Sequence, residues 1–209
     1  MSLHCVHKQF DTESKDIGKS AETMNNEELV AAIVKCTNFA AIKHTSQRRC
    51  NAAKTPYINH PIGVANILVE EGGIYSLPVI MAALLHDTVE DTDTTFDEIK
   101  EHFGEKVCSI VKEVTDDKSL PKQERKRLQI LHAPSSSYEA KLVKLADKLY
   151  NLRDLEKETP VEWTEERVDK YFKWAESVVR GLKGTNANLE QALDELFQRH
   201  STKKIIFEK

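Results

Sequence analysis

The stretch SLPVIMAALLHDTVED, residues 76–91, decides the fold. Every residue from Val79 to Leu85 is apolar, so a helix formed here has no polar side and must be buried on most of its surface. Such a helix requires other elements packed around it. Its far end turns abruptly polar, and we expect the same helix to continue through these residues: His86, Asp87, Glu90 and Asp91.

The segments on both sides of this stretch also carry helical signals. Apolar residues recur at three- and four-residue steps, and Asn, Ser, Thr or Pro precede the expected starts while Gly or Pro follows the ends. No segment alternates apolar and polar residues for long enough to predict a strand. The sequence therefore predicts a single all-α domain of about nine helices over residues 25–200. Residues 1–24 are expected to be a flexible N-terminal extension, and residues 201–209 a C-terminal tail.

Composition excludes several classes of protein. The formal net charge of −4 over 209 residues argues against a nucleic-acid partner or an anionic membrane surface, since no global positive field exists. A mean hydropathy of −0.50, without a long apolar run, argues against a membrane span. The first residues lack the apolar core of a secretory signal. The four cysteines form no CxxC pair, which favours a reducing, cytoplasmic location.

The polar end of the central stretch is the first candidate site. On a continuing helix, His86 and Glu90 share one face, and so do Asp87 and Asp91. Acidic side chains are unfavourable at a helix C-terminus, and a carboxylate is costly to bury without compensation. A solvated acidic helix end is one interpretation of this pattern. We favour the other, a site for a cation.

Two further residues could complete such a site, although spacing alone does not select them. His60 stands just before a predicted helix, where a lone histidine is more often an ordinary loop or core residue. Asp147 lies on the polar face of the predicted helix 138–155, and an amphipathic surface helix explains that face equally well.

Several blocks of the sequence, in one order, resemble a known family. They are QRR, TPYINHPIGVA, AALLHDTVEDTDTT, EVTDDKSLPKQERKRLQ, AKLVKLADKLYNLRDL, YFKWA and GTNANLE. Together they resemble the HD superfamily of metal-dependent phosphohydrolases, and within it the hydrolase domain of the bacterial RelA/SpoT enzymes. The likeness is greatest to the small metazoan SpoT-like hydrolases, and it covers about residues 29–199. The resemblance implies an HD-superfamily helical bundle.

The resemblance implies a metal centre and a catalytic pair. The implied metal ligands are His60, His86, Asp87 and Asp147. This nitrogen and oxygen set suits one first-row divalent ion, usually Mn²⁺ in this family, although Fe²⁺, Co²⁺ and Zn²⁺ fit the same ligand chemistry. The family's acidic pair corresponds to Glu90 and Asp91. Beside a divalent ion that acidifies water, Glu90 is expected to act as general base and Asp91 to assist it.

An anionic substrate also requires cationic side chains, and about half of the available ones are expected to be ordinary surface charges. By resemblance, Arg49 stacks on a purine base and Asn151 holds the base edge or ribose. The remaining residues expected to bind substrate are Lys122, Lys144, Lys148, Arg167 and Tyr171. One departure affects affinity or substrate preference: Cys50 stands where animal relatives commonly carry a lysine.

The resemblance implies hydrolysis of guanosine 3′,5′-bis(diphosphate), ppGpp, to GDP and pyrophosphate. It also admits removal of the 2′-phosphate of NADPH to give NADH at the same site. An HD nucleotidase for other nucleotides, or a metal-binding protein without activity, are further alternatives, which the other matching blocks and the retained Glu90 disfavour. The 209 residues leave no room for a synthetase domain, so only degradation is expected. The expected partner is a small purine nucleotide; no oligomeric state is predicted.

Overall fold

The structure, a computed structural model, describes residues 24–207, with side chains up to Lys203. This part of the chain contains nine α-helices of eight or more residues, the single turn α4, the short 3-10 helix η2 and no β-strand. The bounds are α1 Asn26–Lys43, α2 Asn59–Glu70, α3 Leu77–Leu85, α4 Thr88–Asp91, α5 Phe96–Phe103, α6 Glu105–Val114, α7 Lys122–His132, η2 Ala133–Ser135, α8 Tyr138–Lys157, α9 Glu165–Arg180 and α10 Ala187–Phe207. The all-α prediction is confirmed.

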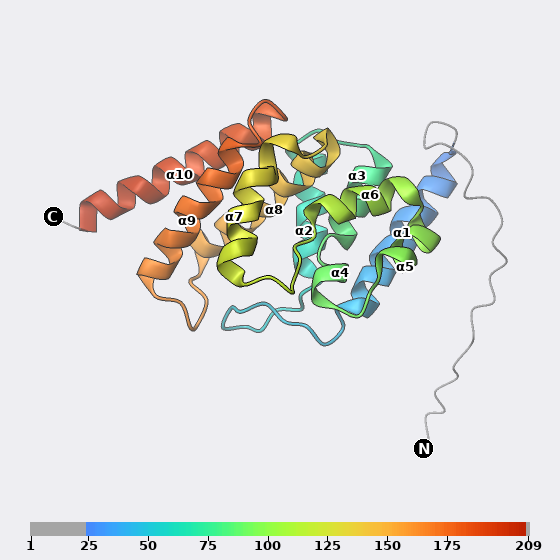
Figure 1. The fold of residues 1–209 in the computed structure, drawn as a ribbon, viewed down its shortest axis with the longest axis horizontal. Helices are drawn as coiled ribbons and strands as arrows, with labels where there is room; N and C mark the ends of the chain where they lie inside the picture. Colours follow the sequence, from blue (N-terminus) through green and yellow to red (C-terminus); the bar gives the residue numbers. More distant parts are fainter. Residues whose placement is uncertain (1–23, 208–209) are drawn as a thin grey trace, which may run out of the picture.

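Helix α3 lies at the centre of the bundle, as its apolar sequence predicts. All seven residues from Val79 to Leu85 are buried, and α3 packs against α1, α2, α6 and α8. In Figure 1, α1 and α5 lie toward one end of the bundle, and α9 and α10 toward the other. None of the described helices combines the length and the apolar character needed to cross a lipid bilayer.

Side-chain caps fix several helix starts where the sequence places capping residues. Asn25 forms a capping box with Glu28 at the start of α1. Thr95, Ser137 and Thr164 each accept a backbone N–H bond at the starts of α5, α8 and α9. These bonds satisfy N–H groups that have no partner within the helix, so the starts are well determined by local sequence.

Outside the central stretch, two predicted helix boundaries differ clearly from the structure. Helix α2 begins at Asn59, ahead of Pro61, so that His60 falls inside its first turn. Helix α10 continues to Phe207, past the expected end near His200, because no glycine or proline follows Asn186 to stop it. Apart from Met24, the expected N-terminal extension lies outside the described residues.

The prediction that one helix continues through Asp91 is wrong. Helix α3 ends at Leu85, and α4 begins only at Thr88. Two side chains take backbone carbonyls near this end: His86 Nδ1 lies 2.7 Å from the Ala83 carbonyl oxygen, and the Thr88 hydroxyl donates to the Leu85 carbonyl at 2.7 Å. Local bonds of this kind compete with the helical pattern. They leave His86 and Asp87 in a turn between the two helices.

A glycine allows α2 and α8 to approach closely. Gly63 faces the ring of Tyr150 on α8, and a Cβ atom at position 63 would overlap that ring. The close packing of these helices matters for the site, because α2 carries His60 and α8 carries Asp147.

Replacement of Gly63 by alanine should therefore destabilise the fold by roughly 1–3 kcal/mol, the usual cost of overpacking a well-packed contact. The measurement is the free energy of unfolding in urea. Asn66→Ala, at an exposed position of the same helix, is the control and should change this free energy little. An equal effect of the two substitutions would contradict the packing argument.

Candidate functional site

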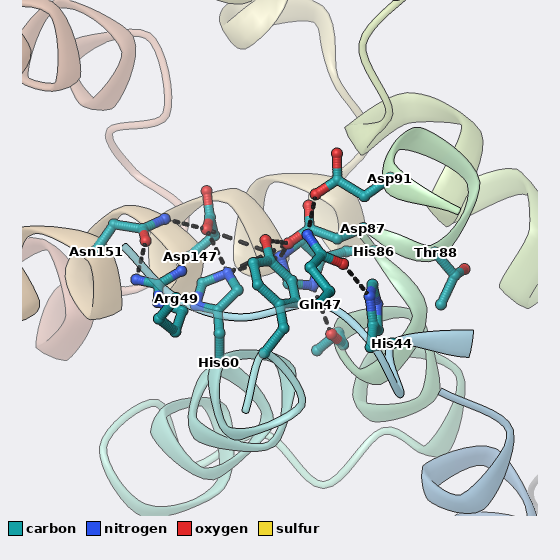
Figure 2. Close-up of polar contacts among 12 residues, drawn as sticks. His44, Gln47, Arg49, His60, His86, Asp87, Thr88, Asp91, Asp147 and Asn151 are labelled. Carbon is teal, nitrogen blue, oxygen red and sulfur yellow. Dashed lines mark hydrogen bonds and ion pairs between the residues drawn. The ribbon is translucent and has the colours of Figure 1, made fainter. Parts of the chain in front are cut away.

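The four predicted metal ligands lie close together where α2, α8 and the turn after α3 meet (Figure 2). Nε2 of His60 lies 3.2 Å from Nε2 of His86 and 3.2 Å from Oδ1 of Asp147. Oδ2 of Asp87 lies 3.0 Å from the His86 nitrogen and 3.4 Å from the His60 nitrogen. Ligand atoms that each lie about 2.1 Å from one ion are separated from one another by about 3 Å, so the observed spacing fits a single divalent cation.

Three separate elements bring these side chains together. His60 lies in the first turn of α2, His86 and Asp87 lie in the turn after α3, and Asp147 lies in the middle of α8. Because α2 packs against both α3 and α8, the three elements face one another. Both imidazoles are almost fully buried, so their polar atoms need partners inside the protein.

The charges around the cluster also favour a cation. Burial lowers the pKa of His86, but the neighbouring Asp87 and Asp147 outweigh it and raise the pKa to about 9. Burial opposes ionisation of Asp87 and Asp147 too, yet His86 beside Asp87 and Lys148 beside Asp147 hold both carboxyl pKa values below the ordinary range. The site thus contains two ionised carboxylates that attract positive charge, and a divalent cation meets that demand.

The orientation of His86 suits a metal ligand. Its Nδ1 lies 2.7 Å from the Ala83 carbonyl oxygen, which can only accept, so Nδ1 carries a proton and donates it. A bound cation would replace the second proton of the ring, and the lone pair of the neutral ring would then be on Nε2, the atom that faces the cluster. Asp147 is held similarly: Lys148 donates to its Oδ2 at 2.8 Å and Asn151 to its Oδ1 at 2.6 Å.

A cavity of about 160 Å³ opens beside the cluster, and Glu90 lines it together with His60, Asp87 and Asp147. The Glu90 carboxylate accepts from the Asp116 backbone N–H at 3.1 Å and from Arg125 at 3.3 Å. Burial raises the pKa of Glu90 to about 7. A carboxylate with that pKa can both take and release a proton near neutral pH, although a cation bound nearby would lower the value again.

Asp91 points to different partners from Glu90. Its Oδ2 accepts from Gln47 at 2.9 Å, as Figure 2 shows. Its Oδ1 accepts from Lys118 at 2.6 Å. Gln47 in turn bonds to His44 at 2.6 Å. Asp91 is not among the residues lining the 160 Å³ cavity. These contacts tie α4 to the loop between α1 and α2, which carries Gln47, and to the loop between α6 and α7, which carries Lys118.

A second cavity, of about 340 Å³, adjoins the first and contains Arg49. The Arg49 guanidinium donates to Asn151 at 2.9 Å and to Asp154 at 2.8 Å. Tyr57 and Asn151 line both cavities, so the two spaces meet at these side chains. Cys50 lines the second cavity as well, which places the departure noted in the sequence at its wall.

The other cationic residues separate into three groups. Lys144 and Lys148 line the 160 Å³ cavity, and burial together with the charge of Lys148 lowers the pKa of Lys144. Lys122 and Arg167 line a third hollow of about 630 Å³ between α7 and α9 instead. Tyr171 lines both this hollow and the second cavity. The fold therefore does not bring Lys122 or Arg167 to the His and Asp cluster itself.

Some of the residues that line or contact these cavities were not predicted from the sequence to be site residues. Tyr57 donates to Oδ2 of Asp87 at 2.6 Å, and burial and the Asp87 charge raise its pKa, so its hydroxyl stays protonated. Asp154 lies seven residues after Asp147 on the polar face of α8, and that spacing could have indicated it. Trp163, which lines the second and third cavities, carries no sequence signal that separates it from a core aromatic.

Comparisons with known proteins identify the family of this chain. Residues 36–173 match the HD domain family. The chain is 65% identical over 167 residues to guanosine-3′,5′-bis(diphosphate) 3′-pyrophosphohydrolase MESH1 of Xenopus tropicalis, a match covering 80% of this chain and 93% of the relative. The protein of that name from Homo sapiens is 62% identical over 81% of this chain and 94% of its own length.

A solved structure with a similar fold carries the description "A metazoan ortholog of SpoT hydrolyzes ppGpp and plays a role in starvation responses". It superimposes with a TM-score of 0.80 at 58% identity, covering 81% of this chain and 95% of the other. The resemblance inferred from the sequence is confirmed. The chain belongs to the HD domain family, in the group of metazoan SpoT-like proteins.

Proposed function

We propose that this protein is a divalent-metal-dependent hydrolase that removes the 3′-diphosphate of ppGpp. The observation that carries the proposal is the pair of adjoining cavities, one holding the His and Asp cluster with Glu90 and the other holding Arg49. A nucleotide whose ribose bears a phosphate group can place that group in the first cavity and its base in the second. The names of the similar MESH1 proteins and the described activity of the SpoT ortholog support this substrate.

The proposed centre uses His60, His86, Asp87 and Asp147 to hold one ion, which we propose is Mn²⁺. A bound divalent ion supplies Lewis-acid charge that polarises a phosphoryl oxygen and acidifies water. Glu90 takes the proton of the attacking water on its carboxylate and returns a proton to the departing ribose oxygen. The bond between phosphorus and the 3′ oxygen breaks, and the products are GDP and pyrophosphate. Asp91 assists by fixing the turn that carries Glu90.

Two lysines offset the charge of the reacting diphosphate. Lys144 and Lys148 follow one another at a four-residue step on α8 and line the cavity beside the cluster. Fixed cations at the place where negative charge develops stabilise a transition state more than mobile solvent does. Lys148 is the more rigid of the two, because it is buried and bonded to Asp147.

The remaining residues bind the nucleoside and the second diphosphate. We propose that Arg49 stacks on the purine while Asn151 bonds to the base edge or ribose, as the 340 Å³ cavity allows. Tyr171 stands between this cavity and the third hollow. We propose that Lys122 and Arg167, which line this hollow, bind the phosphate groups that do not react.

Incubation of the purified protein with Mn²⁺ tests the proposal. ppGpp and NADPH are supplied in separate reactions, and the products are identified by chromatography. Formation of GDP and pyrophosphate is expected with ppGpp. NADH and orthophosphate from NADPH, with ppGpp left intact, would replace the proposed substrate by the alternative. Reactions with EDTA in place of Mn²⁺ should give no product from either.

Replacement of Cys50 by lysine should lower KM. The substitution adds a cation at the wall of the second cavity, and an exposed ion pair worth about 0.5–1 kcal/mol corresponds to a KM about two- to fivefold lower. Steady-state kinetics with ppGpp and NADPH measure the effect. Cys50→Gln, which adds length without charge, is the control. An unchanged KM for both substrates would show that the missing lysine is of no consequence here.

Residues 25–200 are proposed to be the functional unit, with a small purine nucleotide rather than nucleic acid or a membrane as partner. A cytoplasmic location is part of the same proposal. It is supported by the free thiols of Cys36, Cys50 and Cys108 within the described residues, since disulfides are rare in that compartment.

A further inference from the structure

Among the residues around the cluster, Tyr57 makes a contact that the proposed function does not use. We propose that Tyr57 is a positioning residue for the metal site, whose hydroxyl holds the carboxylate of Asp87 in the orientation that binds the ion. The proposal rests on the metal centre proposed above. It concerns how that centre is held, whatever the substrate.

Asp87 needs such support because of its place in the chain. It lies in the turn between α3 and α4, with backbone angles φ −98° and ψ −5°, and no capping bond is made by its side chain. Because the aspartate side chain rotates about χ1 and χ2, it can turn either carboxylate oxygen, or neither, toward the two imidazoles. In the structure, Oδ2 is the oxygen that faces both of them, at 3.0 and 3.4 Å.

The Tyr57 hydroxyl donates to that same oxygen at 2.6 Å. A carboxylate oxygen has room for a hydrogen bond and a metal ion together, since it carries two lone pairs. The bond therefore selects Oδ2 as the ligand atom without blocking it. Hydrogen bonds from neighbouring groups to metal ligands commonly fix ligand orientation in this way.

Tyr57 can act as an anchor because it is itself held on several sides. Its backbone N–H donates to the Gln47 carbonyl at 3.1 Å, and its carbonyl accepts from the His60 N–H at 2.9 Å. Its ring lies edge-on to His60, with ring centres 5.6 Å apart, and 4.9 Å from the ring of His44. The hydroxyl thus has a fixed position relative to the helix that carries His60.

Tyr150 provides a matched comparison within the same site. Its ring also lies edge-on to His60, at 4.9 Å between centres. Within residues 24–203, however, the Tyr150 hydroxyl makes no hydrogen bond to any of the four predicted metal ligands. The two tyrosines share the ring contact with the ligand His60 and differ in the hydroxyl bond to a ligand.

Titration of Mn²⁺ into metal-free protein tests the proposal, with free Mn²⁺ followed by electron paramagnetic resonance. Tyr57→Phe keeps the ring and removes the hydroxyl, and should raise the Kd for Mn²⁺ by about 10- to 100-fold, the usual effect of losing a hydrogen bond to a metal ligand. Tyr150→Phe should leave Kd within about twofold of the unchanged protein, on the same grounds. Turnover of Tyr57→Phe should largely recover at saturating Mn²⁺.

The outcomes separate this proposal from the one on which it rests. If the unchanged protein binds no Mn²⁺, the metal centre itself is wrong. If it binds Mn²⁺ and Tyr57→Phe binds equally well, or both variants weaken alike, Tyr57 does not position the site. Turnover that stays low at saturating Mn²⁺ would also overturn the positioning role. Unfolding temperatures of the metal-free proteins identify any loss of binding that comes from a damaged fold.

Discussion

Substitution of Asp87 by alanine is expected to abolish both Mn²⁺ binding and turnover. The substitution removes one of the two ionised carboxylates in the cluster, and it removes the oxygen that lies 3.0 Å from Nε2 of His86. Two imidazoles and the single carboxylate of Asp147 would remain. Equilibrium dialysis measures bound Mn²⁺ per chain, and product formation from ppGpp measures turnover.

The control is Asp93→Ala. Asp93 is an aspartate just after α4, as Asp87 is one just before it, but the Asp93 side chain is 87% exposed and pairs with Lys43 away from the cluster. Metal binding and turnover should both survive there. One equivalent of Mn²⁺ retained by the Asp87 variant would show that Asp87 is not a ligand, provided that circular dichroism shows both variants to be folded.

Substitution of Glu90 by glutamine should separate binding from chemistry. Glutamine keeps the size of the side chain but cannot take a proton from water near neutral pH. Mn²⁺ should still bind, because the Glu90 carboxylate is bonded to the Asp116 backbone N–H and to Arg125 and not to the His and Asp cluster. The turnover number should fall by roughly 10²- to 10⁴-fold, the contribution of a lost acid–base group. Single-turnover kinetics at saturating Mn²⁺ measure the chemical step directly.

Glu101→Gln, at an exposed position on α5, controls for the loss of one negative charge from the protein. It should not change the rate. Near-normal turnover by the Glu90 variant would remove Glu90 from the mechanism, whereas loss of Mn²⁺ binding by that variant would make it a ligand instead of a base.

Much of the fold follows from local sequence. The unbroken apolar run of Val79 to Leu85 requires a buried helix, and Thr95, Ser137 and Thr164 mark helix starts by bonds within three residues. The convergence of the site does not follow from spacing. His60 and Asp147 are 87 positions apart, and only the packing of α2 against α8 brings their side chains to 3.2 Å. In the sequence, the family resemblance and not the pattern of residues indicated that pair.

The turn at His86 and Asp87 shows a second limit. Helical periodicity predicted a continuous helix through Asp91, since no glycine or proline interrupts it. The break depends on side-chain bonds from His86 and Thr88 to backbone carbonyls, and such bonds become visible only in three dimensions. Tyr57 was missed for a related reason, because its hydroxyl reaches Asp87 across 30 residues of sequence.

Helix α8 has a consequence for the size of any ligand. Asp147 at the cluster and Asp154 beside Arg49 stand on this one helix, seven residues apart, which is about 10 Å along its axis. If a nucleotide occupies both cavities as proposed, this one rigid helix sets the distance between its two ends. Movement of the surrounding loops would change how a ligand enters, while the distance along α8 between Asp147 and Asp154 stays constant.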